Sequence, residues 1–177
     1  MLEQCIFAGF GGQGTLLIGK FLACAGLMEG KEVTWLPSYG PEMRGGTANC
    51  SVIVSDEPVG SPIVDEPNVL MVMNLPSLDK YENAVQSGGI IVLDSTLIER
   101  KVQREDVKVA YIPATKLAAE NNMPTLANMI LVGRILKETG NFDEEAIKAA
   151  LGKVISAKRP EMFDINLKAL QIGRDYE

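Results

Sequence analysis

Short apolar segments alternate with longer helical segments along this chain of 177 residues, and this alternation constrains the fold more than any other feature. Parallel strands need long crossover connections, which are usually helices. The pattern therefore indicates an α/β domain of three layers, α/β/α, around a mostly parallel, Rossmann-like sheet. Strands are predicted at residues 2–7, 33–36, 47–55, 69–73, 89–94 and 107–112, and helices at 15–28 and 75–86.

The C-terminal third is predicted to be helical. No repeat, low-complexity stretch or linker divides the chain, so we expect one domain over residues 1–177. Residues 2–36 are predicted to form a β-α-β unit with a right-handed crossover. The expected C-terminal helices are 115–121, 125–139, 143–155 and 162–172.

Two predicted helices are more apolar than one small core requires. Among residues 126–136 only Asn128, Gly133 and Arg134 interrupt the apolar sequence, and residues 16–28 are similar. A helix that is hydrophobic all round is buried all round. For 16–28, burial within this chain competes evenly with burial against a partner; for 126–136, which comes late in the chain, we favour a partner surface.

Composition excludes several classes of function. The formal charge is 17 − 23 = −6, which argues against unspecific attraction to nucleic acid or an anionic membrane. The chain has no histidine, which excludes Ser-His-Asp and Cys-His catalysis and histidine-bearing metal sites within it. Cys5, Cys24 and Cys50 are too far apart for a C-x-x-C pair, and we interpret them as core residues in a reducing cytoplasm.

A glycine-rich turn follows the first predicted strand. Gly9, Gly11 and Gly14 satisfy G-x-G-x-x-G, in which the glycines permit the turn, close approach of a ligand and helix-to-strand contact. A dinucleotide site also needs an acidic residue at the end of the second strand, but residues 35–38 hold no carboxylate. The turn is therefore interpreted as structural, or as a contact for another ligand, rather than as a dinucleotide site.

A second glycine-rich segment, residues 37–46, contains two prolines, and two glycines follow Arg44 in it. The guanidinium there can fork onto a carboxylate or phosphate, or can pair with Glu42 and only shape the loop. Polar residues also follow other predicted strands, at Asn74, Asp94 and Thr115. Ligands gather at such strand ends, but the role of helix cap or turn former is favoured for all three.

Both motifs resemble those of one enzyme family. The segment from Gly9 to Gly14, the block from Tyr39 to Ala48, and the helix around Asn128 are similar to the gamma subunit of the 2-oxoacid:ferredoxin oxidoreductases, most of all the 2-oxoglutarate type. The resemblance implies a multi-subunit enzyme that oxidatively decarboxylates a 2-oxoacid, such as 2-oxoglutarate or pyruvate. The products are an acyl-CoA and electrons for ferredoxin.

The resemblance also implies a division of labour. Thiamine diphosphate, magnesium and iron–sulfur clusters are expected in alpha, beta and ferredoxin-like delta subunits, with coenzyme A as co-substrate; this chain alone is expected to bind no cofactor, to contain no catalytic residue and to be inactive. The alternative is a stand-alone, nucleotide-binding Rossmann-like enzyme. The resemblance places these residues at a cofactor-facing edge: Gly9, Gly11, Gly12, Gln13, Gly14, Tyr39, Glu42, Arg44, Gly45 and Gly46.

Overall fold

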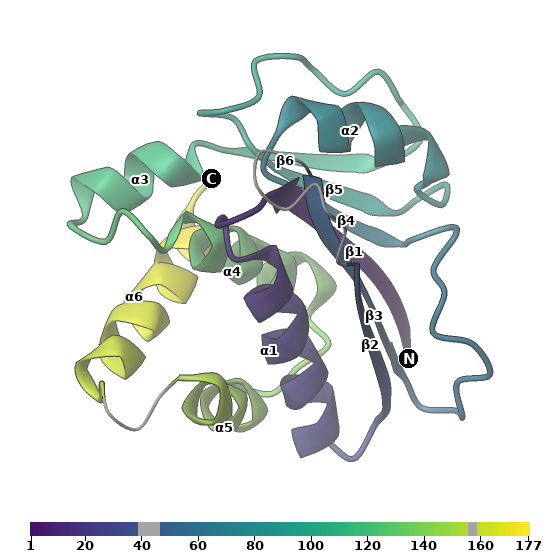
Figure 1. Ribbon diagram of the computed structural model, residues 1–177, viewed down its shortest axis with the longest axis horizontal. Coiled ribbons are helices and arrows are strands. Elements are labelled where there is room, and N and C mark those ends of the chain that lie inside the picture. Colours follow the sequence, from purple (N-terminus) through teal and green to yellow (C-terminus); the bar gives the residue numbers. More distant parts are fainter. Residues whose placement is uncertain (39–46, 156–158) are drawn as a thin grey trace.

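A computed structural model describes residues 1–38, 47–155 and 159–177, and it confirms the α/β fold class. Six strands form one sheet in the order β2-β3-β1-β4-β5-β6 (Figure 1). The strands are β1 (Leu2–Phe10), β2 (Glu32–Ser38), β3 (Thr47–Ser55), β4 (Val69–Val72), β5 (Ile90–Asp94) and β6 (Lys108–Ile112). The helices are α1 (Thr15–Met28), α2 (Leu75–Tyr81), the 3-10 turn η2 (Glu82–Ala84), α3 (Ala114–Glu120), α4 (Ala127–Thr139), α5 (Glu144–Val154) and α6 (Glu161–Asp175).

The sheet is mixed at one end. β1, β4, β5 and β6 pair in parallel, whereas β3 runs antiparallel to both β1 and β2 and lies between them. Phe7 faces Cys50 across one side of β3, and Trp35 faces Val52 across the other. The first two strands of the predicted β-α-β unit are therefore not neighbours, because β3 occupies the position next to β1.

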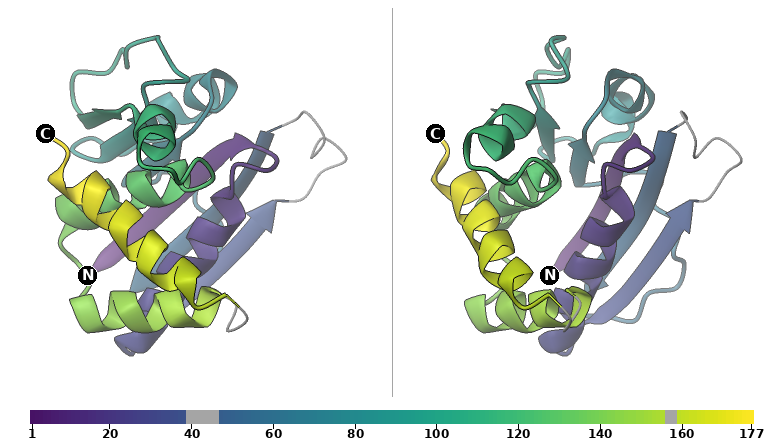
Figure 2. Two further views of the ribbon diagram at one scale, coloured as in Figure 1. Left: turned by 90° about the vertical axis from the view of Figure 1, so that its left-hand side faces the viewer. Right: turned by 60° about the vertical axis from the view of Figure 1, so that its left-hand side comes forward.

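Helices cover the two faces of the sheet unequally. α1, α3, α4, α5 and α6 lie on one face, over the larger apolar cluster (Figures 1 and 2). α2 lies on the other face, where Leu78 and Ile98 belong to a smaller cluster. The helices that follow the adjacent parallel strands β1 and β4 thus leave the sheet on opposite sides. Among the described residues, no helix has the length and apolar character needed to cross a membrane.

The apolar helix α4 is enclosed by this chain, so the predicted partner surface at residues 126–136 is wrong. α6 packs so closely against α4 that an added Cβ at Gly133 would collide with the carbonyl of Leu170, and one at Gly173 with the carbonyl of Ile130. Backbone-to-backbone contact of this kind leaves no room for another chain. By contrast, Leu17 and Leu27 of α1 stay exposed, while its other side packs against the sheet.

We predict that Gly133→Ala or Gly173→Ala destabilises the fold, since the new methyl group must push the two helices apart. Overpacking of this kind costs about 1–3 kcal/mol. Gly152→Ala is the matched control, because that glycine lies in α5 with nothing within contact of an added Cβ. The control should gain up to about 1 kcal/mol from helix propensity. Urea unfolding of the three variants measures whether each change lowers or raises the free energy of unfolding. An unchanged midpoint for Gly133→Ala would contradict the contact between α4 and α6.

Candidate functional site

A cleft of about 240 Å³ opens at the carboxyl ends of the parallel strands. It lies beside the ends of β1 and β4, the two strands whose following helices leave on opposite faces. In open α/β sheets this switch point is where ligands bind. The cleft is lined by the glycine turn, by residues following β4 and β6, and by the start of α4: Gly12, Gln13, Met73, Thr115, Pro124, Thr125, Ala127 and Asn128.

Gln13 fixes the glycine turn in place. Its side-chain oxygen accepts a hydrogen bond from the backbone N–H of Phe10 at 2.6 Å, and its side-chain nitrogen donates to the carbonyl of Met73 at 3.2 Å. The turn that ends β1 is therefore tied to the end of β4. Gly12 and Gly14 have φ angles of 94° and 78°, a region that favours glycine.

The glycines of the motif act differently from the expected pattern. β1 continues through Phe10, so Gly9 lies within the strand, and an added Cβ there would meet the Gln13 amide. An added Cβ at Gly14 would meet the amide of Asn128 in α4. The close helix-to-sheet contacts of α1 are instead made by two glycines that sequence analysis did not single out, Gly19 and Gly26.

Two helix N-termini meet at this cleft. Gly14 is the N-cap of α1 and adjoins Asn128 in the first turn of α4. Neither helix has a side-chain cap or an acidic residue in its first turn, and no lining residue is acidic. The first N–H groups of a helix have no partner within it, and the helix dipole favours negative charge there. The cleft is therefore suited to an anion such as a phosphate group.

The polar residues that follow other strands have structural roles, as the sequence favoured. Asn74 caps α2 by accepting a hydrogen bond from the N–H of Ser77 at 2.8 Å. Asp94, which is fully buried, accepts from the N–H of Thr96 at 3.0 Å and from the N–H and hydroxyl of Thr115 at 3.1 and 2.5 Å. These bonds join the segments that follow β5 and β6.

The second motif lies mostly outside the described residues, including Tyr39, Glu42, Arg44, Gly45 and Gly46. Its described flanks are Ser38, which ends β2, and Thr47, which lies opposite Phe10 at the end of β1. The strand ends that flank the second motif therefore lie at the same edge of the sheet as the end of β1, where the glycine turn begins. Within the part of the chain that the structure describes, no cluster of three acidic or cysteine side chains could hold a metal ion.

Asn128 lines the cleft but was not among the residues predicted for the site, although the helix around it contributed to the family resemblance. It is almost fully buried, its side-chain oxygen accepts a hydrogen bond from the N–H of Met129 at 2.8 Å, and its amide nitrogen is directed at Gly14. The available signal was a lone polar residue at the start of an apolar helix.

A sequence model of the family described as pyruvate ferredoxin/flavodoxin oxidoreductase matches residues 4–176. This chain belongs to that family. It is 42% identical over 171 residues to the ketoisovalerate oxidoreductase subunit VorA of Methanothermobacter marburgensis, covering 96% of this chain and 35% of VorA. It is 34% identical over 154 residues to the 2-oxoglutarate synthase subunit KorC of Methanocaldococcus jannaschii, covering 85% of this chain and 82% of KorC.

Solved structures of the family share the fold. The keto/oxoacid ferredoxin oxidoreductase gamma subunit of Geobacter sulfurreducens matches with a TM-score of 0.81 at 28% identity, over 97% of this chain and 95% of that one. A 2-oxoglutarate:ferredoxin oxidoreductase from Magnetococcus marinus, solved with 2-oxoglutarate, coenzyme A and succinyl-CoA, matches with a TM-score of 0.87 at 27% identity, over 98% of this chain and 30% of that one. The resemblance to gamma subunits is confirmed, and this chain spans about a third of the length of the VorA relatives.

We predict that Gln13→Ala lowers the free energy of unfolding by about 1–3 kcal/mol, because two hydrogen bonds are lost at about 0.5–1.5 kcal/mol each. Gln171→Ala is the control, since that exposed side chain bonds only to Asp175 among the described residues. The control should stay within about 0.5 kcal/mol of the wild type. Denaturant titration compares the two, and equal stability would show that Gln13 does not fix the turn.

Proposed function

We propose that this chain is the gamma subunit of a multi-subunit 2-oxoacid:ferredoxin oxidoreductase. That enzyme converts a 2-oxoacid and coenzyme A to an acyl-CoA and carbon dioxide and passes the electrons to ferredoxin. The observation that carries the proposal is the cleft where the N-termini of α1 and α4 meet without an acidic side chain. A subunit built in this way supplies a phosphate-holding edge, and its partners supply the reactive groups.

The cleft fits a phosphate-bearing ligand by its chemistry. Its polar groups include the backbone N–H of Gly12, the Asn128 amide and the Thr125 hydroxyl. When bound in the assembled enzyme, thiamine diphosphate supplies the decarboxylation chemistry. In this chain, the glycine turn and the start of α4 would bind and orient the phosphates of that cofactor or of coenzyme A.

The substrate within the 2-oxoacid class is 2-oxoglutarate or 2-ketoisovalerate. Similarity over 82% of the length of KorC supports the first, which the sequence resemblance also favours, whereas the higher identity to VorA supports the second. Assays of the assembled enzyme with both acids and with pyruvate identify which 2-oxoacid is its substrate.

The alternative function, a stand-alone nucleotide-binding enzyme, is less well supported. A dinucleotide ribose is held by a carboxylate at the end of the strand next to β1. Here β3 lies next to β1 in antiparallel orientation, and β2 ends at Ser38 without a carboxylate.

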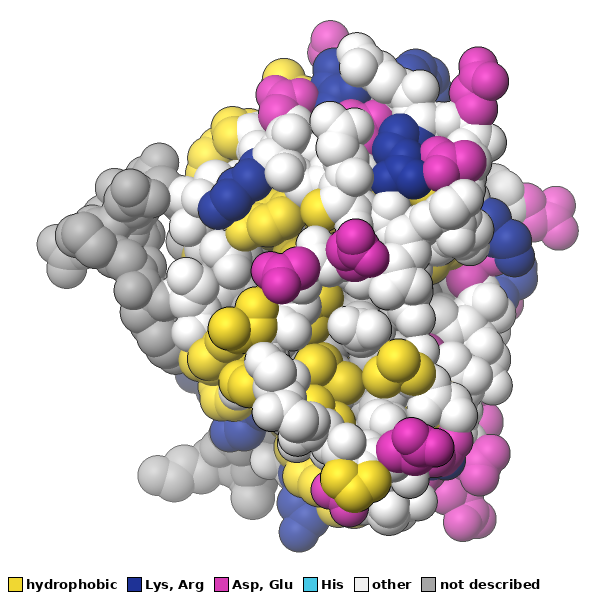
Figure 3. Space-filling model, turned by 90° about the vertical axis from the view of Figure 1, so that its right-hand side faces the viewer, with side chains coloured by type: hydrophobic (Ala, Val, Ile, Leu, Met, Phe, Trp, Pro, Cys, Tyr) yellow, Lys and Arg dark blue, Asp and Glu magenta, His cyan; other side chains and the backbone are white. Residues whose placement is uncertain are grey.

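An exposed face of the sheet is the proposed contact with the catalytic partner. Apolar side chains gather on the side of the molecule shown in Figure 3, opposite the helical layer. Leu36 of β2 and Phe10 of β1 are each 42% exposed, and strand alternation directs both away from α1. Because the VorA relatives carry about two thirds of their length outside the matched region, we assign this face to the polypeptide that corresponds to that remainder.

We predict that the purified chain oxidises no 2-oxoacid and that activity appears on co-expression with the neighbouring genes for its partners. Leu36→Asp should abolish co-purification, because it places a charge in an apolar contact. Leu97→Asp, at a similarly exposed residue, is the control and should assemble normally. Ferredoxin reduction and size-exclusion chromatography give the two readouts. Turnover by the isolated chain would refute the assignment.

We predict that Thr125→Asp in the assembled enzyme raises the KM for coenzyme A or for the thiamine cofactor about 5-fold. A carboxylate about 4 Å from a phosphate costs about 1 kcal/mol in water, which corresponds to that factor. The same change should stabilise the chain by about 0.3–1 kcal/mol through the dipole of α4. Thr125→Asn is the uncharged control. If neither KM rises, the cleft does not hold a phosphate.

A further inference from the structure

β2 is an edge strand of the sheet (Figure 2). Among the described residues it pairs with β3 alone, in an antiparallel register that runs from Glu32 opposite Ser55 to Ser38 opposite Asn49. The outer side of an edge strand presents unpaired N–H and C=O groups, which are a ready template for another strand. The backbone and side chains of β2 therefore determine what this edge can bind.

The direction of each backbone group in β2 follows from a hydrogen bond elsewhere in the sheet. The carbonyl of Ala8 in β1 accepts from the N–H of Met73 at 3.0 Å, so even-numbered residues of β1 bond toward β4. Along an antiparallel strand, residues direct their N–H and C=O groups alternately to one neighbour and to the other. When this alternation is carried through the registers of β1, β3 and β2, the backbone groups of Val33, Trp35 and Pro37 face the free edge.

Pro37 agrees with this assignment. Proline has no N–H and is found on edge strands with that side of its backbone away from the ladder. The free edge thus offers the N–H groups of Val33 and Trp35 and the carbonyls of all three residues. No backbone hydrogen bond outside the sheet ladders involves these groups within the described part of the chain. Residues 33–36 also carry no charge, which is the usual protection of a strand edge.

Apolar side chains are exposed on both faces of this one strand. Leu36, 42% exposed, lies on the face where the contact with the catalytic partner is proposed. Trp35, 37% exposed, lies on the opposite face, where an added Cβ at Gly19 of α1 would meet its indole nitrogen. A flat contact against one face of the sheet would cover Leu36 and leave Trp35 in water. A strand added at the edge covers both, because its side chains alternate between the two faces.

We propose that an extended segment of the catalytic partner adds to the free edge of β2 as a seventh strand of the sheet, an inference that rests on the gamma-subunit function proposed above. The segment exchanges hydrogen bonds with Val33 and Trp35 and donates one to the carbonyl of Pro37. In such strand addition, main-chain hydrogen bonds give affinity and side-chain contacts give specificity. Because both faces of the edge are apolar, the segment should be apolar at successive positions and not at alternate ones.

A second copy of this chain fits the edge less well than the partner does. A two-fold axis at Thr34 would set the charged Glu32 opposite the apolar Leu36 of the other copy. An axis one residue later would place Pro37 opposite Val33, whose carbonyl would then lack a donor. The partner segment has neither mismatch, and it continues the contact already proposed on the adjacent face of the same strand.

Amide hydrogen exchange of the free chain and of the assembled enzyme tests the proposal without a variant. In the free chain the amides of Thr34 and Leu36, which bond to β3, should exchange slowly, and those of Val33 and Trp35 should exchange fast. Assembly should slow Val33 and Trp35 at least 10-fold. Unchanged exchange at these two residues would overturn the proposal. Slow exchange there in an isolated chain that elutes as a dimer would overturn the choice of occupant.

Val33→Pro removes the edge-facing N–H, and Val33→Ala is the matched control that shortens the side chain and keeps the N–H. The proline variant should bind the immobilised partner about 10-fold more weakly than the alanine variant, because a hydrogen bond is lost and its acceptor is left unpaired. The two variants should melt at similar temperatures, since the chain's own sheet does not use this N–H. Thr34→Pro, which removes a bond to β3, should melt lower.

The outcomes separate strand addition from the function on which it rests. If the wild-type chain forms no complex with its partners, both proposals fail. If the wild type assembles and Val33→Pro binds the partner as tightly as Val33→Ala, strand addition at β2 is wrong and the gamma-subunit function stands.

Discussion

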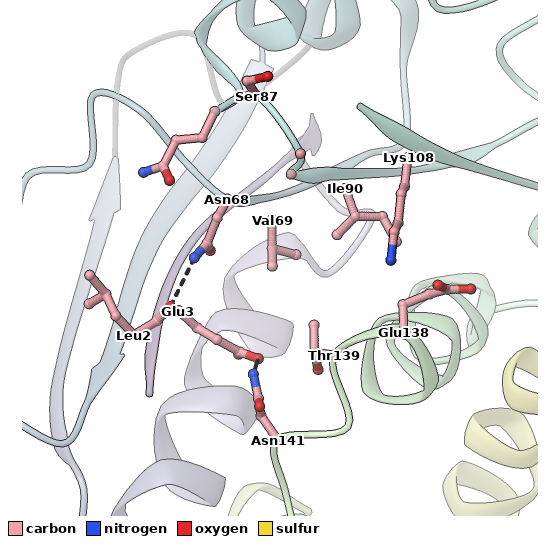
Figure 4. Close-up of a pocket in the computed structure, with 13 residues that line it drawn as sticks. Leu2, Glu3, Asn68, Val69, Ser87, Ile90, Lys108, Glu138, Thr139 and Asn141 are labelled. Atoms are coloured by element: carbon pink, nitrogen blue, oxygen red, sulfur yellow. Dashed lines mark hydrogen bonds between the residues drawn. The ribbon is translucent and has the colours of Figure 1, made fainter. Parts of the chain in front are cut away.

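Gly133 and Gly173 bring α4 and α6 into backbone contact, and the position of two cavities, one at each end of α4, follows from this contact. With α6 on one side and the sheet on the other, α4 is held as a buried helix in the middle of the larger cluster. Its first turn contributes Asn128 to the cleft beside the glycine turn, and its last turn contributes Thr139 to a second cavity, of about 320 Å³, at the opposite edge of the sheet (Figure 4). Thirteen helical residues span about 20 Å, so a shift of this one helix would alter both cavities.

The two cavities lie at opposite ends of α4 and differ in the charge of their lining side chains. Its N-terminus lies at the carboxyl edge of the sheet, where no lining residue is acidic. Its C-terminus lies at the other edge, where Glu3 and Glu138 line the cavity. A helix dipole stabilises anions at its start and cations at its end. The two acidic side chains therefore lie near the end of α4 where the dipole disfavours negative charge, and the acid-free cleft lies at the end where it favours an anion.

The sequence predicted the bounds of the helices and strands well, but it predicted less well which of them lie next to one another. The predicted bounds 15–28 and 47–55 match α1 and β3, because glycine, proline and aspartate residues interrupt the mostly apolar sequence at the ends of these elements. The position of β3 between β1 and β2 depends on non-local pairing, which no local pattern encodes. The enclosure of α4 was missed for a related reason: it depends on Gly173, which lies in another helix, 40 residues further along the chain.

The site residues divide in the same way. Gln13 and the glycines around it could be assigned to a turn because a turn has a local signature, whereas the contacts of Asn128 and Glu3 arise from packing. Glu3 did carry a signal, since strand alternation places it on the same face as Cys5 and Phe7, both fully buried. An acid at a core-facing position opposes folding unless it is paired or neutral. Glu3 is such a group: burial raises the pKa of its carboxyl, while Asn141 and Thr139 lower it, so the neighbouring side chains offset part of the cost that burial imposes.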